Sequence, residues 1–157
     1  MSTLRDIFQN YVLIASVTAW MVAQIFKVII DLLYSKKFNW ERLTGAGGMP
    51  SSHSAGVCAL TIALSRTEGV KSAVFAFAFV MSCIVMYDAM SVRREAGEHA
   101  KIINKMVRDL DDDSDEDEKN SGKADEDNEL KEILGHTPLE VLAGACLGIL
   151  VALIVPS

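Results

Sequence analysis

The sequence predicts an all-α fold, a polytopic membrane bundle of about four transmembrane helices. Half of the 157 residues are hydrophobic. They gather in four stretches, at about residues 11–33, 52–66, 70–92 and 138–155. The charged residues lie between these stretches, and many belong to one acidic run at residues 109–129. Because a chain of this length has room for one small domain, residues 1–157 are expected to form a single membrane domain.

The first stretch, residues 11–33, is long enough to cross a hydrocarbon core of roughly 30 Å even when tilted. We do not expect it to be a cleaved signal peptide. Its apolar part is too long for one, Lys27 lies inside it, and no small-residue cleavage site follows. An ionisable residue at this depth is a functional candidate, although Lys27 can also extend its amine to the lipid headgroups.

The remaining stretches differ in length and composition. The apolar part of the second stretch, Ser54–Ser65, is short for a span, so this helix crosses only if it includes Ser51–His53 or if protein covers its ends. Residues 70–92 are rich in Ala, Phe, Val and Met. The last stretch has a face of small residues that favours close helix packing or a homo-oligomer. These residues are Ala143, Gly144, Ala145 and Gly148.

The three cysteines, Cys58, Cys83 and Cys146, all fall within apolar stretches. A cysteine in such a place usually behaves as a small buried hydrophobic residue, so we expect a structural role for each. No Cys or His pair has the spacing of metal ligands, and we therefore expect neither a metal site nor a cofactor.

Four spans bring the end of the first, the start of the second, the end of the third and the start of the fourth to one face. That face has nine lysines and arginines, against three on the other. The positive-inside rule therefore predicts a multi-pass protein of the cell membrane, with this face in the cytoplasm and both termini outside.

The acidic run at residues 109–129 has twelve acidic residues and two lysines. Such a composition is typical of a solvated, disordered loop. A calcium loop is a weaker interpretation of its regularly spaced aspartates, because the expected glycine and terminal glutamate are absent. Just before it, residues 95–108 have the pattern of an amphipathic helix at the membrane surface. The side chains expected to face lipid are Ile102, Ile103, Met106 and Val107.

Two short motifs about eighty residues apart each place a histidine at the start of an apolar stretch. One is Gly-Gly-Met-Pro-Ser-Ser-His-Ser at residues 47–54, and the other is Gly-His-Thr-Pro-Leu-Glu-Val at residues 135–141. If both helices start on one face, His53 and His136 can face one substrate. The positive helix N-termini favour an anion there, and phosphate is the natural one. Glu140 follows His136 by one helical turn, where a carboxylate can orient an attacking imidazole.

Three segments resemble motifs of the type 2 phosphatidic acid phosphatase and vanadium haloperoxidase superfamily. They are Pro50-Ser51-Ser52-His53, Ser91-Val92-Arg93-Arg94 and the run from His136 to Gly144. The first resembles the Pro-Ser-Gly-His motif of that superfamily. The second resembles the Ser-Arg with which the superfamily's last motif begins. The third resembles the end of that last motif, a His-x-x-x-Asp followed by Val-x-Ala-Gly. With the preceding Gly-Gly-Met, the pattern is similar to the divergent branch of this superfamily, whose members are small membrane proteins.

The resemblance implies a phosphatidic acid phosphatase-like helical core and a phosphatase that hydrolyses a lipid phosphate or pyrophosphate without a metal. It assigns His136 as the nucleophile that forms a phosphohistidine, Glu140 as its orienting carboxylate and His53 as the general acid. Phosphate is expected to be held by Lys27, Gly48, Ser51, Ser52, Arg93 and Arg94. The expected partners are the lipid phosphate substrate and membrane lipids, with no nucleic acid.

The sequence departs from the superfamily pattern in several places. In ordinary members five residues separate the arginine from the nucleophile, whereas 41 separate Arg94 from His136. The gap from Arg93 to His99 keeps the usual spacing, which makes His99 a rival nucleophile. We prefer His136, because no carboxylate follows His99 by four residues and no apolar span begins beside it. Glu140 and Ser52 replace the usual Asp and Gly, and Lys27 stands in for a missing early Lys-Arg motif.

Simpler interpretations of the same residues stay open. Glu140 also completes a capping box with Thr137, and Pro138 suits the first helical position. Ser51 or Ser52 can serve only as a helix cap, and the two arginines can serve only as membrane anchors. The alternative function is a non-catalytic membrane protein that binds anionic headgroups or a partner. A haloperoxidase is the weakest alternative, since nothing in the sequence indicates peroxide chemistry.

Overall fold

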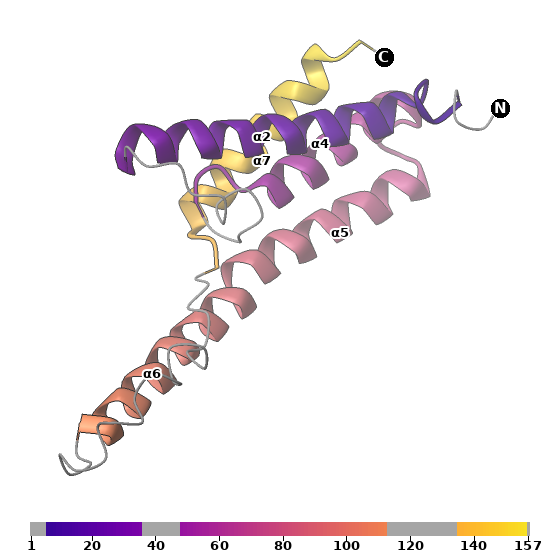
Figure 1. Cartoon of the computed structure of the whole chain (residues 1–157). Coiled ribbons are helices and arrows are strands. Elements are labelled where there is room, and N and C mark those ends of the chain that lie inside the picture. The colour runs from indigo at the N-terminus through magenta and orange to yellow at the C-terminus, as the bar shows by residue number, and fades with distance from the viewer. Residues whose placement is uncertain (1–5, 36–47, 113–134, 157) are drawn as a thin grey trace.

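The computed structural model describes residues 6–35, 48–112 and 135–156, and the regular structure in these ranges is helical (Figure 1). The helices are α2 (Tyr11–Ser35), α4 (Ser52–Thr67), α5 (Ala73–Met90), α6 (Val92–Asp112) and α7 (Pro138–Ile154). Four of them, α2, α4, α5 and α7, occupy the four apolar stretches of the sequence. The predicted all-α membrane bundle is therefore confirmed.

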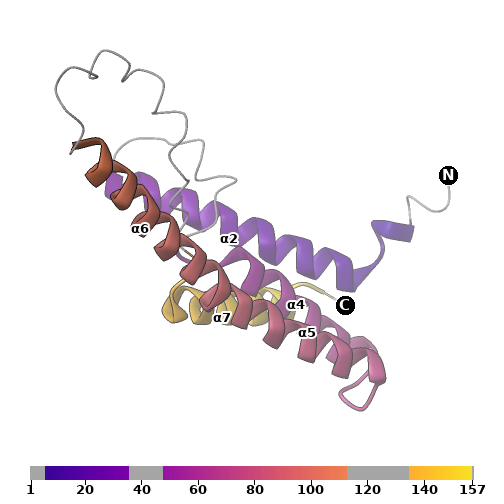
Figure 2. The ribbon, with the colours of Figure 1, turned by 90° about the horizontal axis from the view of Figure 1, so that it is seen from below.

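The helices differ in their ability to cross a membrane by themselves. By length and hydropathy, Tyr11–Leu33 and the continuous segment Ala73–Asp109 are long and apolar enough, whereas Pro138–Ile154 is apolar but shorter. The 16-residue α4 lies at the centre of the bundle and packs against α2, α5 and α7 (Figures 1 and 2). Its neighbours therefore cover the short helix, which is the condition that its length imposes.

Helices α4 and α7 approach each other through two glycines. A Cβ on Gly144 would overlap the carbonyl oxygen of Ser51, and a Cβ on Gly148 would overlap that of Ala55. Backbones this close leave no room for a side chain, which explains the Gly-x-x-x-Gly spacing. The small-residue face predicted for close packing is thus used within the chain, between α4 and α7. The homo-oligomer considered from the sequence stays a prediction.

Helices α2 and α4 meet along two rows of alanines spaced four residues apart. Ala15, Ala19 and Ala23 of α2 are fully buried against the row Ala55, Ala59 and Ala63 of α4. Residues four apart form one ridge on a helix, and small side chains let two such ridges lie close together. The next position in the α2 row is Lys27, which is also buried. The alanine row therefore leads directly to a buried cation.

Polar side chains also join α4 to α5 within the apolar part of the bundle. The hydroxyl oxygens of Thr61 and Ser82 lie 2.7 Å apart, and Ser82 Oγ donates to the carbonyl oxygen of Val57 at 2.9 Å. Hydroxyl groups between membrane helices satisfy each other and the backbone where water is absent. These bonds set the rotation of α5 about its axis relative to α4.

Arg66, in the last turn of α4, joins three helices at one end of the bundle. Its Nη1 donates to the hydroxyl of Tyr11 at 2.5 Å and to the carbonyl oxygens of Ala152 at 2.6 Å and Val155 at 3.3 Å. The Tyr11 hydroxyl itself donates to the Ala152 carbonyl oxygen at 2.8 Å. The start of α2 and the ends of α4 and α7 therefore lie together, as the predicted topology requires. We call this the Arg66 end.

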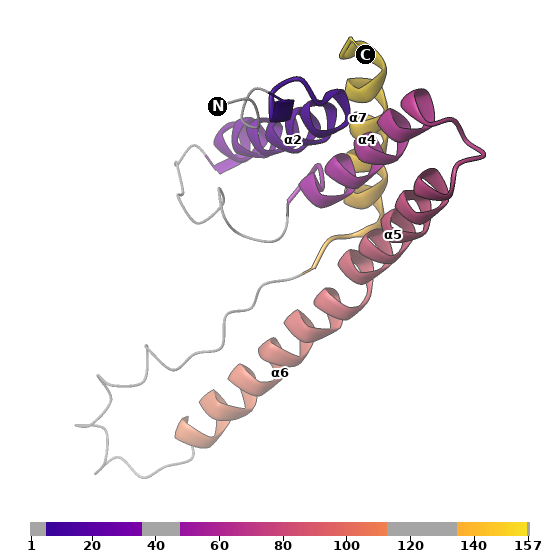
Figure 3. The same ribbon diagram turned by 90° about the vertical axis from the view of Figure 1, so that its right-hand side faces the viewer.

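The amphipathic helix predicted at residues 95–108 is present as part of α6, but its direction differs from the expectation. Helix α6 continues the course of α5 away from the bundle and does not turn across its end (Figures 1 and 3). The reason is local. The amide of Ser91 bonds Tyr87 and that of Glu95 bonds Ser91, each at 2.9 Å, so the hydrogen-bond ladder continues between the two helices. A helix lying flat on the membrane surface is therefore not what the structure shows.

The acidic run was predicted to be a loop from residue 109 onward, but residues 109–112 belong to α6. The helix ladder extends that far before it ends. The remainder of the run, residues 113–129, lies outside the described residues. The calcium loop was considered for Asp111, Asp113 and Asp115, and the last two of these lie in that part.

Burial of all three cysteines was also expected, and it holds only for Cys58, whose Sγ lies 3.8 Å from the Sδ of Met86. Cys83 and Cys146 are exposed. Cys83 follows Ser82, which faces α4, and Cys146 lies midway between the two glycines that face α4. Both thiols therefore point away from the bundle interior, where a lipid-facing side chain is equally apolar.

Candidate functional site

Two helix N-termini lie together at the end of the bundle opposite the Arg66 end. Ser51 caps α4, its Oγ accepting from the amide of Ser54 at 3.4 Å, and Thr137 caps α7. The amide of Ser51 donates to the carbonyl oxygen of Glu140 at 3.0 Å, which fixes one N-terminus against the other. Both helices therefore direct the positive ends of their dipoles toward one region, which we call the motif end.

The two motif histidines are neighbours at this end. His53 lies in the first turn of α4, and His136 comes just before the cap of α7. Their ring centroids are 6.5 Å apart and the ring planes are inclined by 59°. The amide of His136 donates to the carbonyl oxygen of Ala89 at 3.0 Å, which ties it to the end of α5. The predicted meeting of two imidazoles distant in the sequence is thus present in the structure.

Glu140 makes both of the contacts considered from the sequence. Its Oε2 lies 3.2 Å from Nδ1 of His136 and accepts from the amide of Thr137 at 3.0 Å. Its own amide bonds the Thr137 hydroxyl at 3.4 Å, which completes the capping box. With Nδ1 donating to Glu140, the lone pair of a neutral His136 is on Nε2. The carboxylate of Glu140 therefore has two roles at once: it caps α7, and it sets the orientation of the His136 imidazole.

The burial of the two histidines differs. His136 is 2% exposed, and its Nε2 is among the buried side-chain atoms. His53 is exposed and lines an open groove. Among the described residues, His53 is therefore open to a ligand, whereas His136 is covered.

Lys27 is 4% exposed and lies on the face of α2 that packs on α4. Helix α2 runs toward the motif end. Lys27 therefore lies in the half of α2 that is nearer the motif end. Simple extension of the amine to the lipid headgroups, the alternative considered from the sequence, does not fit a side chain buried this deeply.

The segment before α4 has features of both a phosphate loop and a helix cap. Gly48 has a φ of 83°, a conformation that favours glycine. Ser51 and Ser52 are buried, and Ser51 Oγ also accepts from the hydroxyl of Ser54 at 3.0 Å. The capping role of Ser51 is therefore present in the structure, while phosphate contacts by Gly48, Ser51 and Ser52 stay predictions.

The two arginines begin α6 about one helical turn beyond Ala89, whose carbonyl accepts from His136. The side chain of Arg94 is exposed. His99 is exposed further along α6, which continues from the end of α5 and extends away from the motif end (Figure 3). The structure thus keeps Arg93 and Arg94 near the end of α5 that contacts His136. It leaves His99 on a helix that is directed outward.

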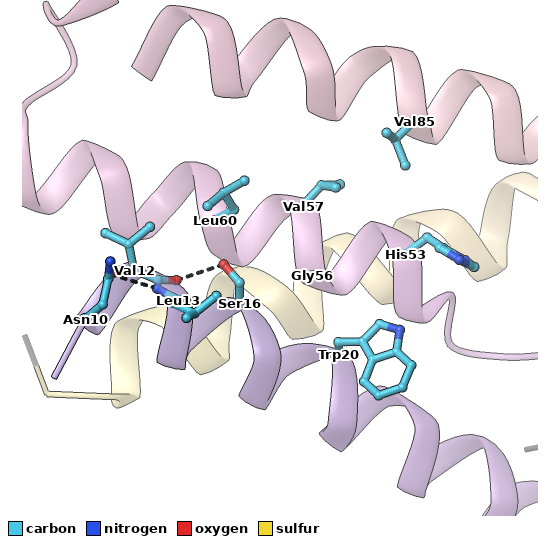
Figure 4. A pocket seen from close by; sticks show the side chains of 10 residues that line it. All are labelled: Asn10, Val12, Leu13, Ser16, Trp20, His53, Gly56, Val57, Leu60 and Val85. Atoms are coloured by element: carbon cyan, nitrogen blue, oxygen red, sulfur yellow. Dashed lines mark hydrogen bonds between the residues drawn. The ribbon is translucent and has the colours of Figure 1, made fainter. Parts of the chain in front are cut away.

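A groove beside His53 was missed at the level of sequence. It runs between α2, α4 and α5, has a volume of about 610 Å³ and is lined mainly by apolar side chains (Figure 4). Its one local signal is Gly56 in α4, which lies against Trp20. A glycine inside an apolar helix predicts either a close contact with a neighbouring helix or a hollow beside it. Only the packing of the helices in the folded protein decides which of the two is present. Among the described residues, no three His, Cys, Asp or Glu side chains gather as metal ligands do.

Comparisons with known proteins agree with this arrangement. Residues 8–151 match the family model described as the Divergent PAP2 family, where PAP2 is the type 2 phosphatidic acid phosphatase. The chain is 40% identical over 151 residues to the uncharacterized membrane protein YuiD of Bacillus subtilis (strain 168), covering 95% of this chain and 96% of that protein. No solved structure matches the chain. The protein is therefore a membrane protein of the divergent PAP2 family, related to the phosphatidic acid phosphatases.

Proposed function

We propose that the protein is an integral membrane phosphatase that hydrolyses a lipid phosphate or pyrophosphate through a phosphohistidine on His136. One observation carries the proposal. Two imidazoles from segments about eighty residues apart lie 6.5 Å apart where two helix N-termini converge. Neither capping nor packing of α4 and α7 requires a second histidine at this place.

The spacing of the rings suits one phosphoryl group. A nucleophile attacks from about 3–3.5 Å, and a general acid donates its proton over about 2.8 Å. The 6.5 Å between the ring centroids brings both imidazoles within reach of one phosphoryl group. Because His136 is buried, local movement at the motif end has to open the space between the rings before a phosphate contacts both of them.

In the first step, the Nε2 lone pair of His136 forms a bond to phosphorus while the bond from phosphorus to the ester oxygen breaks. The departing oxygen takes a proton from the imidazolium of His53. A lipid phosphate then leaves as an alcohol, and a lipid pyrophosphate leaves as the lipid monophosphate. Glu140 accepts the Nδ1 proton in a hydrogen bond and stabilises the charge that develops on His136.

In the second step, water attacks phosphorus and gives a proton to His53, which is now neutral. The bond from phosphorus to Nε2 breaks, its electron pair returns to His136, and inorganic phosphate leaves. His53 is then protonated again, so that one water is consumed in each cycle. General acid and base catalysis of this kind contributes typically about 10²–10⁴-fold to the rate.

The phosphate oxygens need positive partners during transfer. The N-termini of α4 and α7 supply two helix dipoles, and Lys27, Gly48, Ser52 and the arginines of α6 are the proposed side-chain and backbone donors. Removing one preorganised donor typically lowers kcat by about 10²–10³-fold. The positive-inside rule places this end of a multi-pass protein in the cytoplasm, so we propose that the lipid headgroup is presented there.

The test uses purified protein in nanodiscs and measures phosphate released from lipid phosphates and pyrophosphates, with and without a chelator. We expect release that a chelator leaves unchanged and that vanadate inhibits. His136→Ala and His53→Ala should each abolish it, and an acid-labile phosphoprotein should be trapped in the wild type but not in His136→Ala. His99→Ala is the matched control and should retain activity. Full activity of both His136→Ala and His53→Ala would disprove the mechanism.

A second candidate is a non-catalytic protein that binds anionic headgroups. The burial of His136 favours it, because a nucleophile that is 2% exposed needs an opening before it meets substrate. Saturable binding of lipid phosphates by the wild type, weakened in His53→Ala and accompanied by no phosphate release from any lipid tested, would establish this alternative.

A further inference from the structure

The groove beside His53 follows α4 from the motif end toward the Arg66 end (Figure 4). Apolar side chains line most of it, from three helices: Leu13, Trp20, Val57, Leu60 and Val85. Its volume of about 610 Å³ lies within the range of small-molecule sites, about 300–1,000 Å³. His53 therefore borders two different environments, the polar motif end and an apolar groove.

The hollow depends on a missing side chain. A Cβ on Gly56 would lie 3.7 Å from the Cβ of Trp20 and 3.8 Å from the carbonyl oxygen of Ser16, which are ordinary contacts. A longer side chain at this position would extend into the groove. Helix α5 packs on α4 and, within the described residues, makes no extended contact with α2, so the space along α4 stays open.

The groove runs along the length of the bundle, between its two ends. Its side on α2 extends from Asn10, which directly precedes the helix, to Trp20, a rise of about 15 Å, and His53 lies beyond Trp20. A lipid chain of one leaflet reaches about half of the roughly 30 Å hydrocarbon core, about 15 Å, so the groove is long enough to hold one. His53 lies at one end and Asn10 at the other, as Figure 4 shows. A headgroup at His53 thus leaves the chain directed toward the Arg66 end.

We propose that this groove holds one hydrocarbon chain of the lipid whose phosphate lies between His53 and His136. The inference rests on the proposed function, because it takes these histidines as the phosphate site. Three observations select this occupant: the groove is continuous with His53, its lining is apolar, and its sides face lipid. Leu13 is 42% and Trp20 is 44% exposed. The hydrocarbon chain of the lipid therefore enters the groove sideways from the bilayer and never passes through water.

If the groove binds the hydrocarbon chain of the substrate, the activity depends on the length of that hydrocarbon chain. Each methylene that leaves water for an apolar site improves affinity by at most about fourfold, and by less in a groove that is open on one side. Hexadecyl phosphate and butyl phosphate carry the same reacting group, and only the longer one fills the groove. We expect kcat/KM for hexadecyl phosphate to exceed that for butyl phosphate by more than about tenfold.

Gly56→Leu tests the groove without touching the histidines. The added side chain occupies the hollow, so kcat/KM for hexadecyl phosphate should fall by about tenfold or more while the value for butyl phosphate stays the same. Cys146→Leu is the matched control, because it adds a leucine on the exposed face of α7 at a similar depth. Equal loss for both substrates in Gly56→Leu would overturn the inference.

A binding measurement keeps the test decisive if Gly56→Leu does not fold. Trp20 lines the groove, and the protein has two tryptophans, so Trp40→Phe leaves Trp20 as the sole tryptophan, which can be excited selectively at the red edge of its absorption. We expect a dibrominated long-chain alkyl phosphate, added at low mole fraction to phosphatidylcholine nanodiscs, to quench Trp20 saturably. Unbrominated hexadecyl phosphate should reverse the quenching, and a dibrominated alcohol of the same length should quench only as bulk lipid does. Equal quenching by phosphate and alcohol would overturn the inference.

The two proposals fail in different ways. Saturable quenching of Trp20 with no phosphate release would refute hydrolysis and leave the groove as a lipid site. Hydrolysis of both substrates at equal rates, unchanged in Gly56→Leu and without saturable quenching, would refute the groove and leave the phosphatase intact.

Discussion

The two ends of the bundle differ in the helix termini that they bring together and in what lies beside those termini. At the Arg66 end, one guanidinium donates to the carbonyl groups that end α7 and to the hydroxyl of Tyr11. At the motif end, the starts of α4 and α7 lie side by side with their caps in place, and a buried lysine lies on the neighbouring face of α2. One end neutralises helix termini with a cation. The other brings positive termini together.

The difference separates stability from function. Helix carbonyls bonded to Arg66 need no ligand, because the protein supplies the opposite charge itself. The motif end gathers two helix N-termini and a lysine beside the carboxylate of Glu140. Converging helix N-termini favour an anion between them. Substitutions at the Arg66 end should therefore affect folding, and those at the motif end should affect activity.

The largest effect on folding is expected from Gly144→Leu. The new side chain meets the backbone of Ser51, so α7 must move away from α4 and the two histidines must separate. We expect a loss of about 3 kcal/mol or more in the free energy of unfolding, measured by denaturant titration in detergent, and complete loss of activity. Cys146→Leu on the same helix should retain both properties. A stable, active Gly144→Leu protein would contradict the close packing of α4 on α7.

Arg66→Ala should destabilise the bundle without disabling the chemistry. It removes three hydrogen bonds from a charged donor, and we expect a loss of about 2 kcal/mol. In protein that remains folded, kcat/KM should stay within about twofold of the wild type, since this end of α4 is about twenty ångströms from the histidines along the helix. Arg66→Lys should recover part of the stability. A large fall in activity with unchanged stability would break the contrast between the two ends.

Thr137→Ala and Glu140→Gln divide the two roles of Glu140. Thr137→Ala removes the hydroxyl that caps α7 and should cost about 1 kcal/mol of stability with little change in kcat. Glu140→Gln keeps an oxygen for the cap but removes the charge beside Nδ1 of His136, and kcat should fall by about 10–100-fold. Both variants are compared by thermal melting and by phosphate release. Equal effects on kcat would mean that Glu140 serves only as a cap.

The smallest effect is expected from deletion of residues 111–127. If this acidic run is a solvated loop, its removal changes kcat/KM for lipid phosphates and the melting temperature by little, because it supplies none of the proposed site residues. Phosphate release and thermal melting of the deletion variant and the full chain provide the measurement. Loss of folding or activity would assign the run a structural or substrate-binding role.

Much of this arrangement follows from local patterns. The apolar stretches predict the helices, the Thr137 to Glu140 spacing predicts the capping box, and Gly144 with Gly148 predicts close packing. The proximity of His53 and His136 followed from the topology of four alternating spans. Local patterns failed where a side chain's surroundings depend on rotation or direction. Cys83 and Cys146 face outward, and α6 continues the line of α5.

The sequence by itself determined the all-α bundle, the positions of its helices and the residue types available for phosphate chemistry, because hydrophobic period and capping act within a few residues. Only the tertiary structure decided the 6.5 Å spacing of the imidazoles, the burial of Lys27 in line with the alanine row, the three-helix contact of Arg66 and the groove at Gly56. These features join segments far apart along the chain. Their geometry comes from the close approach of backbones at alanine and glycine. The small-residue pattern predicts such an approach, but it does not specify which helix lies against it or at what rotation.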